Sequence, residues 1–579
     1  MADQAVINRI GAVLAVCLMY SGVALSEPPD AGAQQQQLQR ELQRLKPEFV
    51  PAPPPARESA PSVPTDDGPT LRVTGFVLQG ITLIPKDKAD EALQPFTNRV
   101  LTFRQLEEAA TSVAALYASF GRSARAVIPE QDVSEGIVRI DIIEAKAGDI
   151  IVDTLNGKSS RVSGAVIERF IRRNNPKGEP LSLSGLDRSI ALINELPGMV
   201  VGGVLEAGDE AQETDVRLRS ASTSLVSGNL AVSNAGSAST GHMQTFANLA
   251  VNSALGFGEQ LVLDLIDSRG LLYGSARFEM PVGYSGWRTG LVLSRLDYET
   301  LRGFGSTIAT GDATVVGVQS NFALERSVSS AKTLGFSFEK KNYQSAVSGT
   351  VFTDSEIYNL SASLSGLNRR PNLLFKWNVT ASVGDLRLLN DNQATLDASG
   401  ASTAGTFGKA TFSAVASMPV RLIDDRTALT ASVYGQLASK NLNSAEQFYL
   451  GGPYAIRAYP VAQGAGSQGV IASLNLSRQF GQSLSVGLFA DAGVIQQYVS
   501  TWGTPSDPDA WKGLTRAANV YELYSGGITA AYAYRGLQLD ATFAHRIGDN
   551  PLYNAAGKQL NVDNRYLRDQ AWVRATLSF

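Results

Sequence analysis

Cysteine and histidine are the residues that this chain has least of. Its 579 residues include one cysteine, Cys17, and two histidines, His242 and His545, which lie far apart. Neither histidine has a cysteine or carboxylate cluster at the spacing of metal ligands, so we predict neither a metal site nor a cofactor. Because the one cysteine stands so close to the N-terminus, the rest of the chain has no disulfide framework.

Strong net charge and long apolar runs are also lacking. The formal net charge is −4, which gives no indication of a nucleic-acid partner. Hydrophobic residues make up 44% of the chain. After the N-terminus, however, no apolar run reaches the roughly 18 residues of a membrane-spanning helix. Glycine is abundant instead, with 54 residues, as is typical of a chain with many tight turns.

Patterns typical of enzymes are absent or out of place. Residues 464–469 match the letters of G-x-G-x-x-G, but they open no predicted helix and belong to no βαβ unit, so dinucleotide binding is not indicated. No nucleophile elbow or kinase-type loop occurs in the sequence. We therefore predict that the protein is not an enzyme.

Three N-terminal segments differ in composition. Residues 1–26 have the pattern of a secretory signal peptide, with Arg9 before an apolar run and a small-x-small cleavage site at 24–26. Residues 27–46 are predicted to be helical, with Leu38, Leu42 and Leu45 on one stripe. The Pro-rich segment 47–70 has no means of packing a core and is interpreted as a linker.

Residues 71–219 have the pattern of two small α+β units, at 71–146 and 147–219. In the first unit, residues 101–121 are predicted to form a helix with one apolar side made of Leu106, Ala109, Ala110, Val113 and Leu116. Small sheets of this kind leave strand edges open, and an open edge can accept an extended segment of another protein. The alternative is that both units only support the domain that follows them.

Residues 220–579 alternate between apolar and polar positions in segments of about ten residues, which is typical of an outer-membrane β-barrel. Short turns alternate with mostly longer connections, and both this asymmetry and the leader argue against a soluble β-sandwich. An even number of strands, sixteen, is predicted at 221–232, 242–254, 258–267, 270–281, 286–298, 312–324, 331–342, 353–364, 370–384, 404–420, 424–438, 468–480, 482–493, 519–533, 535–545 and 568–579.

The predicted final strand carries a separate signal at the C-terminus. Its apolar face consists of Val573, Ala575, Leu577 and Phe579. A terminal aromatic residue after such alternation resembles the signal that the barrel-assembly machinery reads in outer-membrane proteins.

The segment 448–480 is too long for a hairpin turn and too apolar for a solvated linker. Arg457 is the only charge between Glu446 and Arg478, and a cation in such surroundings needs a partner. The nearest candidate carboxylate that follows it is Asp491, on the polar side of a strand-like run. From spacing alone, both residues could instead make unrelated surface contacts.

In their order along the chain, these segments resemble the two-partner secretion transporters, the TpsB family of ShlB/FhaC/HecB-like haemolysin secretion/activation proteins. In that family the sixth extracellular loop has a V-R-G-Y tip whose arginine pairs with the aspartate of an F-x-D-x-G strand. The resemblance assigns Ile456, Arg457, Ala458 and Tyr459 to the tip, with alanine at the family's glycine position, and Phe489, Asp491 and Gly493 to the barrel wall.

Other segments fit the same family. Two strings, IPEQD at 128–132 and LINELP at 192–197, resemble sequence motifs of its polypeptide-transport-associated (POTRA) domains. The helix 27–46 corresponds to the helix that plugs the barrel in this family. LRGF at 301–304 is closer in letters to V-R-G-Y than 456–459 is. It lacks the motifs that flank the loop tip in the family, and we therefore interpret it as a chance match and not as the loop tip.

The resemblance implies a mostly β protein, a 16-stranded transmembrane β-barrel preceded by two POTRA domains and a plug helix. We expect it in the outer membrane of a Gram-negative bacterium, in contact with lipid and with its POTRA domains in the periplasm. It would bind the secretion domain of a large secreted β-helical partner of the TpsA type and pass that partner through its barrel. The alternative is an outer-membrane insertase of the same superfamily.

Overall fold

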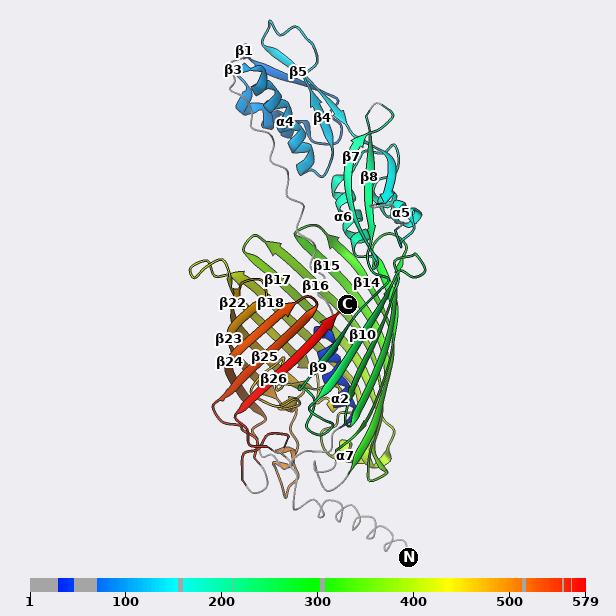
Figure 1. Ribbon diagram of the computed structural model, residues 1–579, viewed down its shortest axis with the longest axis vertical. Helices are drawn as coiled ribbons and strands as arrows, with labels where there is room; N and C mark the ends of the chain where they lie inside the picture. Colours follow the sequence, from blue (N-terminus) through cyan, green and yellow to red (C-terminus); the bar gives the residue numbers. More distant parts are fainter. Residues whose placement is uncertain are drawn as a thin grey trace, which may run out of the picture.

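The computed structural model describes residues 30–45, 70–154, 160–210, 212–301, 308–512, 517–553, 557–563 and 565–579. The predicted signal peptide, nearly all of the predicted linker and residues 302–304 of the LRGF string lie outside the described residues. Figure 1 shows two small α+β domains at one end of a closed barrel, with helix α2 inside the barrel. Among the described helices, none is both long enough and apolar enough to cross a membrane.

The first α+β domain packs one long helix against two small sheets. Its elements are β1 (Thr70–Val73), β2 (Gly75–Gln79), α3 (Lys86–Leu93), η1 (Gln94–Phe96), β3 (Arg99–Thr102), α4 (Phe103–Ser119), β4 (Ala124–Val127) and β5 (Ile137–Glu144). The sheets have the orders β1-β3 and β2-β5-β4. A capping box between Thr102 and Gln105 begins α4. Its buried face is the predicted one, except that Tyr117 is fully buried and Leu116 only partly so.

The second α+β domain lies against the barrel. It contains β6 (Lys146–Thr154), α5 (Gly164–Asn174), α6 (Leu183–Asn194), β7 (Met199–Ala207) and β8 (Glu213–Ser222), with the sheet order β6-β8-β7. Arg188 on α6 donates to the backbone oxygens of Ser285 and Leu324 at 3.2 and 3.1 Å, and also to that of Ala323. Arg326 forms an ion pair with Glu195. These contacts fix the domain to two barrel turns.

Sixteen antiparallel strands close into the barrel, as the alternation predicts. They are β9 (Val226–Ser233), β10 (Gln244–Asn252), β11 (Gln260–Ser268), β12 (Leu271–Val282), β13 (Trp287–Glu299), β14 (Ala309–Arg326), β15 (Ser330–Val347), β16 (Thr350–Arg370), β17 (Leu373–Leu388), β18 (Gly405–Pro419), β19 (Thr427–Ala438), β22 (Gln468–Phe480), β23 (Leu484–Gln496), β24 (Val520–Tyr534), β25 (Leu537–Ile547) and β26 (Asp569–Ser578).

Two features of the barrel differ from the prediction. Its first strand begins at Val226 rather than at 221, because residues up to Ser222 pair with β7. Strands β14, β15 and β16 reach 18, 18 and 21 residues, well beyond the predicted segments of about ten. The turn Ser348-Gly349, with φ of 50° and 81°, joins β15 directly to β16, so their ladder continues to the turn.

The two faces of the barrel wall differ in polarity, as β23 illustrates. Leu484 and Leu488 are exposed on one face, whereas Phe489 and Asp491 are buried on the other. Since successive side chains of a strand point to opposite faces, the acidic residue faces the lumen and the leucines face outward.

The barrel lumen contains helix α2 (Ala31–Leu45) (Figure 1). Leu38 is buried and Leu42 partly buried in one cluster with residues of the lumen wall, among them Phe246, Tyr343 and Phe407. The side chain of Leu45, the third member of the predicted stripe, lies outside the described residues. The remaining short elements lie in connections: α7 (Asp391–Ser399), η3 (Ser444–Glu446), β20 (Phe448–Tyr449), β21 (Ala465–Gly466) and η4 (Ala510–Lys512).

Replacing Arg188 should loosen the second α+β domain from the barrel without unfolding either. Arg188→Ala leaves three backbone oxygens without their donor, at a cost of roughly 1–3 kcal/mol. We expect faster subtilisin cleavage between β8 and β9, with the heat-modifiable electrophoretic shift of the folded barrel unchanged. Arg173→Ala, at an exposed position of α5, is the control. Equal cleavage of both variants would show that the Arg188 contacts do not hold the domain.

Candidate functional site

The connection between β19 and β22, residues 439–467, folds back on itself and is called loop 6 below. Its short strand β20 pairs antiparallel with β21. Between them, the backbone N–H of Ile456 donates to Leu450 O at 2.8 Å, and that of Gly452 to Tyr459 O at 3.1 Å. Loop 6 therefore has a tip, residues 456–459, whose shape is set by its own backbone hydrogen bonds.

Arg457 at this tip binds Asp491 on β23. Its Nε lies 3.0 Å from Asp491 Oδ2 and its Nη2 lies 2.7 Å from Oδ1, which is the bidentate geometry of an arginine–carboxylate pair. The backbone N–H of Arg457 also donates to Oδ2, at 3.1 Å. The side chain of Asp491 is 0% exposed and that of Arg457 is 12% exposed. The pair thus joins the loop to the wall in surroundings that exclude water.

Neighbouring strands complete the surroundings of this carboxylate. Ser473 on β22 and Ser525 on β24 stand directly beside Asp491 in the ladder. Their hydroxyls donate to Asp491 Oδ1 at 2.5 Å and to Oδ2 at 2.7 Å. Five hydrogen bonds therefore satisfy the carboxylate oxygens. Such saturation is what a buried charge requires.

The other two residues assigned to the wall shape the space around the tip. The guanidinium carbon of Arg457 lies 3.4 Å from the ring centroid of Phe489, so the cation stacks on this ring. At Gly493 an added Cβ would lie 2.9 Å from Leu450 Cδ2 and 3.1 Å from Ile456 Cδ1. Loop 6 therefore packs against the wall at Gly493 too closely to leave room for a side chain there.

The remaining tip residues, Ile456, Ala458 and Tyr459, are all 0% exposed and belong to one apolar cluster with Phe489. Ala458 stands at the family's glycine position, but its backbone is not in the left-handed region. That conformation occurs instead at Ala462, with φ of 70°. The alanine side chain therefore fits the tip without backbone strain.

Several contacts of the tip were not identified from the sequence. Trp572 Nε1 on the last strand donates to Arg457 O at 2.8 Å. The guanidinium carbon of Arg546, a residue only 2% exposed, lies 4.5 Å from the ring centroid of Tyr459. Gln463 of loop 6 accepts from Val562 N at 2.9 Å and thereby joins loop 6 to the connection that follows β25. In the sequence, only the aromatic character of Trp572 and the positive charge of Arg546 could have indicated a contact, and nothing indicated Gln463.

The other sequence candidates lie elsewhere. On the face of β26 opposite Trp572, Val573 and Leu577 are exposed and Ala575 is partly buried, and Phe579 directly after the strand is exposed as well. His545 lies at an exposed ion-pair position, 2.8 Å from Asp569. No group of three or more potential metal ligands occurs among the residues that the structure describes. Residues 464–469 form part of loop 6 and begin β22, with no helix after them.

The closed barrel, the two periplasmic-type domains and the loop held in the lumen define an outer-membrane protein transporter. The family model described as "Haemolysin secretion/activation protein ShlB/FhaC/HecB" matches residues 212–504, and that of the "POTRA domain, ShlB-type" matches residues 71–145. The chain belongs to this ShlB/FhaC/HecB family. It is an outer-membrane transporter of the two-partner secretion class, with its POTRA region in the periplasm, and it acts with an exported partner of the TpsA type. The family is one of secretion channels and is not known as a family of enzymes.

Individual relatives agree with this membership. The chain is 23% identical to the heme/hemopexin transporter protein HuxB of Haemophilus influenzae, over 71% of this chain and 73% of the relative. It is 24% identical to the outer membrane transporter CdiB of Dickeya dadantii, over 69% and 71% of the two chains. The solved structure of CdiB from Escherichia coli shares the fold, with a TM-score of 0.68 at 19% identity, over 96% of this chain and all of that one.

A side chain added at Gly493 should displace the tip. The Cβ of Gly493→Val would lie 2.9 Å from Leu450 Cδ2 and 3.1 Å from Ile456 Cδ1, and its two methyl groups add further bulk, so we expect the tip to shift and the Arg457–Asp491 pair to weaken. We expect loop 6 to become sensitive to protease added outside cells, while the barrel still assembles. Gly274→Val is a matched control, because nothing lies within 4 Å of the Cβ position of this strand glycine. Protection of loop 6 in both variants would contradict the close approach at Gly493.

Proposed function

We propose that the two POTRA-like domains capture the N-terminal secretion domain of a large adhesin- or haemolysin-type partner in the periplasm. The partner then passes through the barrel in extended form and folds at the cell surface as a β-helix, which gives the transport its direction without a nucleotide. No covalent step is catalysed. The observation that carries this proposal is a loop held by a buried ion pair inside a barrel that has strand edges at its periplasmic end.

Open strand edges support the capture step. β4 and β7 each stand at the end of a three-stranded sheet, in the first and second α+β domain respectively. On β7, Val200, Val204 and Leu205 are exposed. An extended partner segment that adds to such an edge gains backbone hydrogen bonds with little dependence on its sequence, and the exposed apolar residues add contact area.

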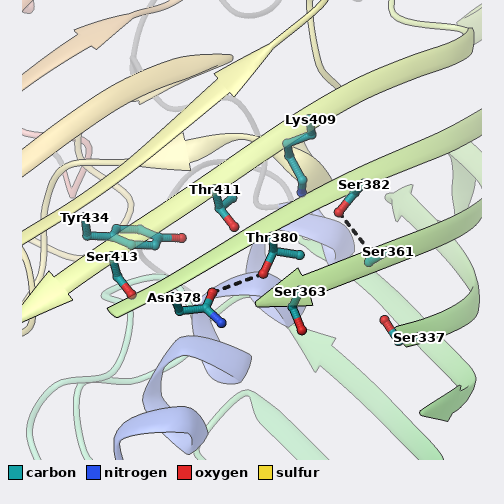
Figure 2. Close-up of a pocket in the computed structure, with 10 residues that line it drawn as sticks. All are labelled: Ser337, Ser361, Ser363, Asn378, Thr380, Ser382, Lys409, Thr411, Ser413 and Tyr434. Carbon is teal, nitrogen blue, oxygen red and sulfur yellow. Dashed lines mark hydrogen bonds between the residues drawn. The ribbon is translucent and has the colours of Figure 1, made fainter. Parts of the chain in front are cut away.

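The lumen wall supports passage of an extended chain. A cavity of about 550 Å³ is lined by polar side chains of neighbouring strands, which Figure 2 shows. Most of them are small hydroxyl or amide groups: Ser337, Ser361, Ser363, Asn378, Thr380, Ser382, Thr411 and Ser413, with Lys409 and Tyr434 beside them. Such groups offer weak, exchangeable hydrogen bonds to any peptide backbone, each contributing about 1 kcal/mol. This wall would therefore bind a moving chain loosely.

Barrel lipid contacts and biogenesis form part of the same proposal. The exposed Leu577 of β26 and Phe579 directly after this strand suit a lipid surface. We propose that the barrel-assembly machinery reads them together with Val573 and Ala575. Helix α2, in the lumen, would act as the plug of the resting transporter.

Breaking the ion pair should reduce secretion while leaving barrel assembly intact. Arg457→Ala or Asp491→Ala leaves the partner charge buried and unpaired, which costs roughly 3–5 kcal/mol, so we expect secretion to fall about tenfold or more. The measurement is the amount of partner in the medium, with the heat-modifiable shift as the check on folding. Arg478→Ala is the control, because the side chains of its ion pair with Asp424 are 50% and 26% exposed and the pair is therefore open to solvent. Normal secretion from both tip and wall variants would contradict the role of this pair.

Deletion of the gene distinguishes a dedicated transporter from an insertase of the same superfamily. We expect the loss of one large extracellular protein, with other outer-membrane barrels at normal levels. Quantitative proteomics of the medium and of outer membranes, with and without the gene, makes this comparison. A broad fall in many barrels would overturn the proposal and favour the insertase.

A further inference from the structure

The base of loop 6 carries a second buried ionic contact, which involves other strands of the wall than the tip does. Glu446, at the end of η3, is 1% exposed. Its Oε1 lies 2.8 Å from Lys341 Nζ, and its Oε2 accepts a hydrogen bond from Lys409 Nζ. A second carboxylate, that of Glu339, lies 3.3 Å from Lys341 Nζ. Two cations and two anions therefore balance one another in the lumen.

This contact spans a broad part of the wall. Lys341 lies on β15 and Lys409 on β18, and β16 and β17 stand between these strands. The backbone of Glu446 is held as well, because Gln436 Nε2 on β19 donates to Glu446 O at 2.9 Å and to Ser467 O at 3.1 Å. Side chain and backbone together fix the 3₁₀ turn η3 against the inner wall.

The plug helix rests on the same turn. A Cβ added to Gly32 of α2 would lie 2.4 Å from Ala445 Cβ, so only glycine permits this approach. Ala31 N donates to Ser345 Oγ on β15 at 3.2 Å. Ala31 and Ala445 are buried in one cluster. The first turn of α2 thus packs against the residue next to Glu446 and against the strand that carries Lys341.

We propose that Glu446 is a positioning residue that retains the plug helix by fixing η3 between the wall and α2. The inference rests on the proposed function as a transporter and deepens it, because it states what keeps the resting pore closed. Without this carboxylate, the positive charges of Lys341 and Lys409, whose side chains are only 9% and 12% exposed, repel each other at the place where η3 packs against the wall. The turn then leaves the wall and α2 loses the surface on which it packs.

The test measures the position of the plug in the purified full-length protein, with no partner present. Gln35 Nε2 of α2 lies 3.2 Å from Ser294 Oγ on β13, so Gln35→Cys with Ser294→Cys gives a pair for a short bis-methanethiosulfonate crosslinker. The only native cysteine is Cys17, in the predicted leader. In this background, Glu446→Gln should lower the crosslinking yield about fivefold or more and raise the fraction of open pores in planar bilayers.

Two further variants make the result specific. Gly32→Val should expel the helix without changing any charge. Lys340→Met should leave both the crosslinking yield and the closed state unchanged, because Lys340 pairs with Glu356 on the other face of β15. The inference is overturned if Glu446→Gln keeps the wild-type crosslink and closed pore while Gly32→Val loses them. An equal loss in Lys340→Met would overturn it too, because any change of wall charge would then release the plug.

Lys409→Met replaces Glu446→Gln if the latter does not show the heat-modifiable shift of a folded barrel. It removes one cation from the same contact, so a plug that stays crosslinked at the wild-type level would contradict the inference. These readouts need no client protein. A failure here therefore leaves the proposed function standing, whereas the deletion experiment tests that function regardless of where the plug lies.

Discussion

A charge buried in a barrel wall has to be neutralised from inside the barrel, and this constraint organises the structure around Asp491. Its side chain has no exposed surface, and the adjacent strands supply only the hydroxyls of Ser473 and Ser525. The cation comes from loop 6, which must enter the lumen to deliver it. The small size of Gly493 and the ring of Phe489 then follow as the space and the surface that the incoming tip requires.

The lumen has two kinds of inner surface, one with apolar clusters and buried ion pairs and the other with small polar groups. Around the loop tip, apolar side chains surround one ion pair. Around the base of loop 6 and helix α2, a second apolar cluster adjoins the lysine–glutamate contact. The cavity on β15 to β19 is lined mainly by hydroxyls and amides. The first kind of surface holds its contents in place, because apolar burial and paired charges are lost together when a segment leaves. The second kind has little to lose from exchange with water or with a passing chain.

Much of the fold could be predicted from the sequence because a barrel strand is encoded locally. Alternation has a period of two residues, and it is visible within each segment, so all sixteen strands were located. The ends of β14 to β16 were not, because the hairpin at Ser348-Gly349 extends the ladder beyond the apolar band. Helix α7 was not anticipated either, since its sequence lies in a polar connection between two strands.

The site was predictable only in part. Arg457 and Asp491 were indicated by the scarcity of charge around them and by the resemblance of their surroundings to a family motif. Ser473 and Ser525 depend on the register between strands, which alternation alone does not specify. Glu446 was visible only as the boundary of the uncharged stretch, because both of its lysine partners lie far from it in sequence and on separate strands.

The hydrogen bond from Trp572 to Arg457 O has a consequence for the order of events during biogenesis. These residues are 115 positions apart, and Trp572 lies on β26, which pairs with β9 to close the barrel. Loop 6 is synthesised earlier, but the surface that receives its carbonyl does not exist until the last strand is in place. This contact can form only after β26 is in place, so a barrel that lacks its last strand also lacks part of the surface that holds loop 6.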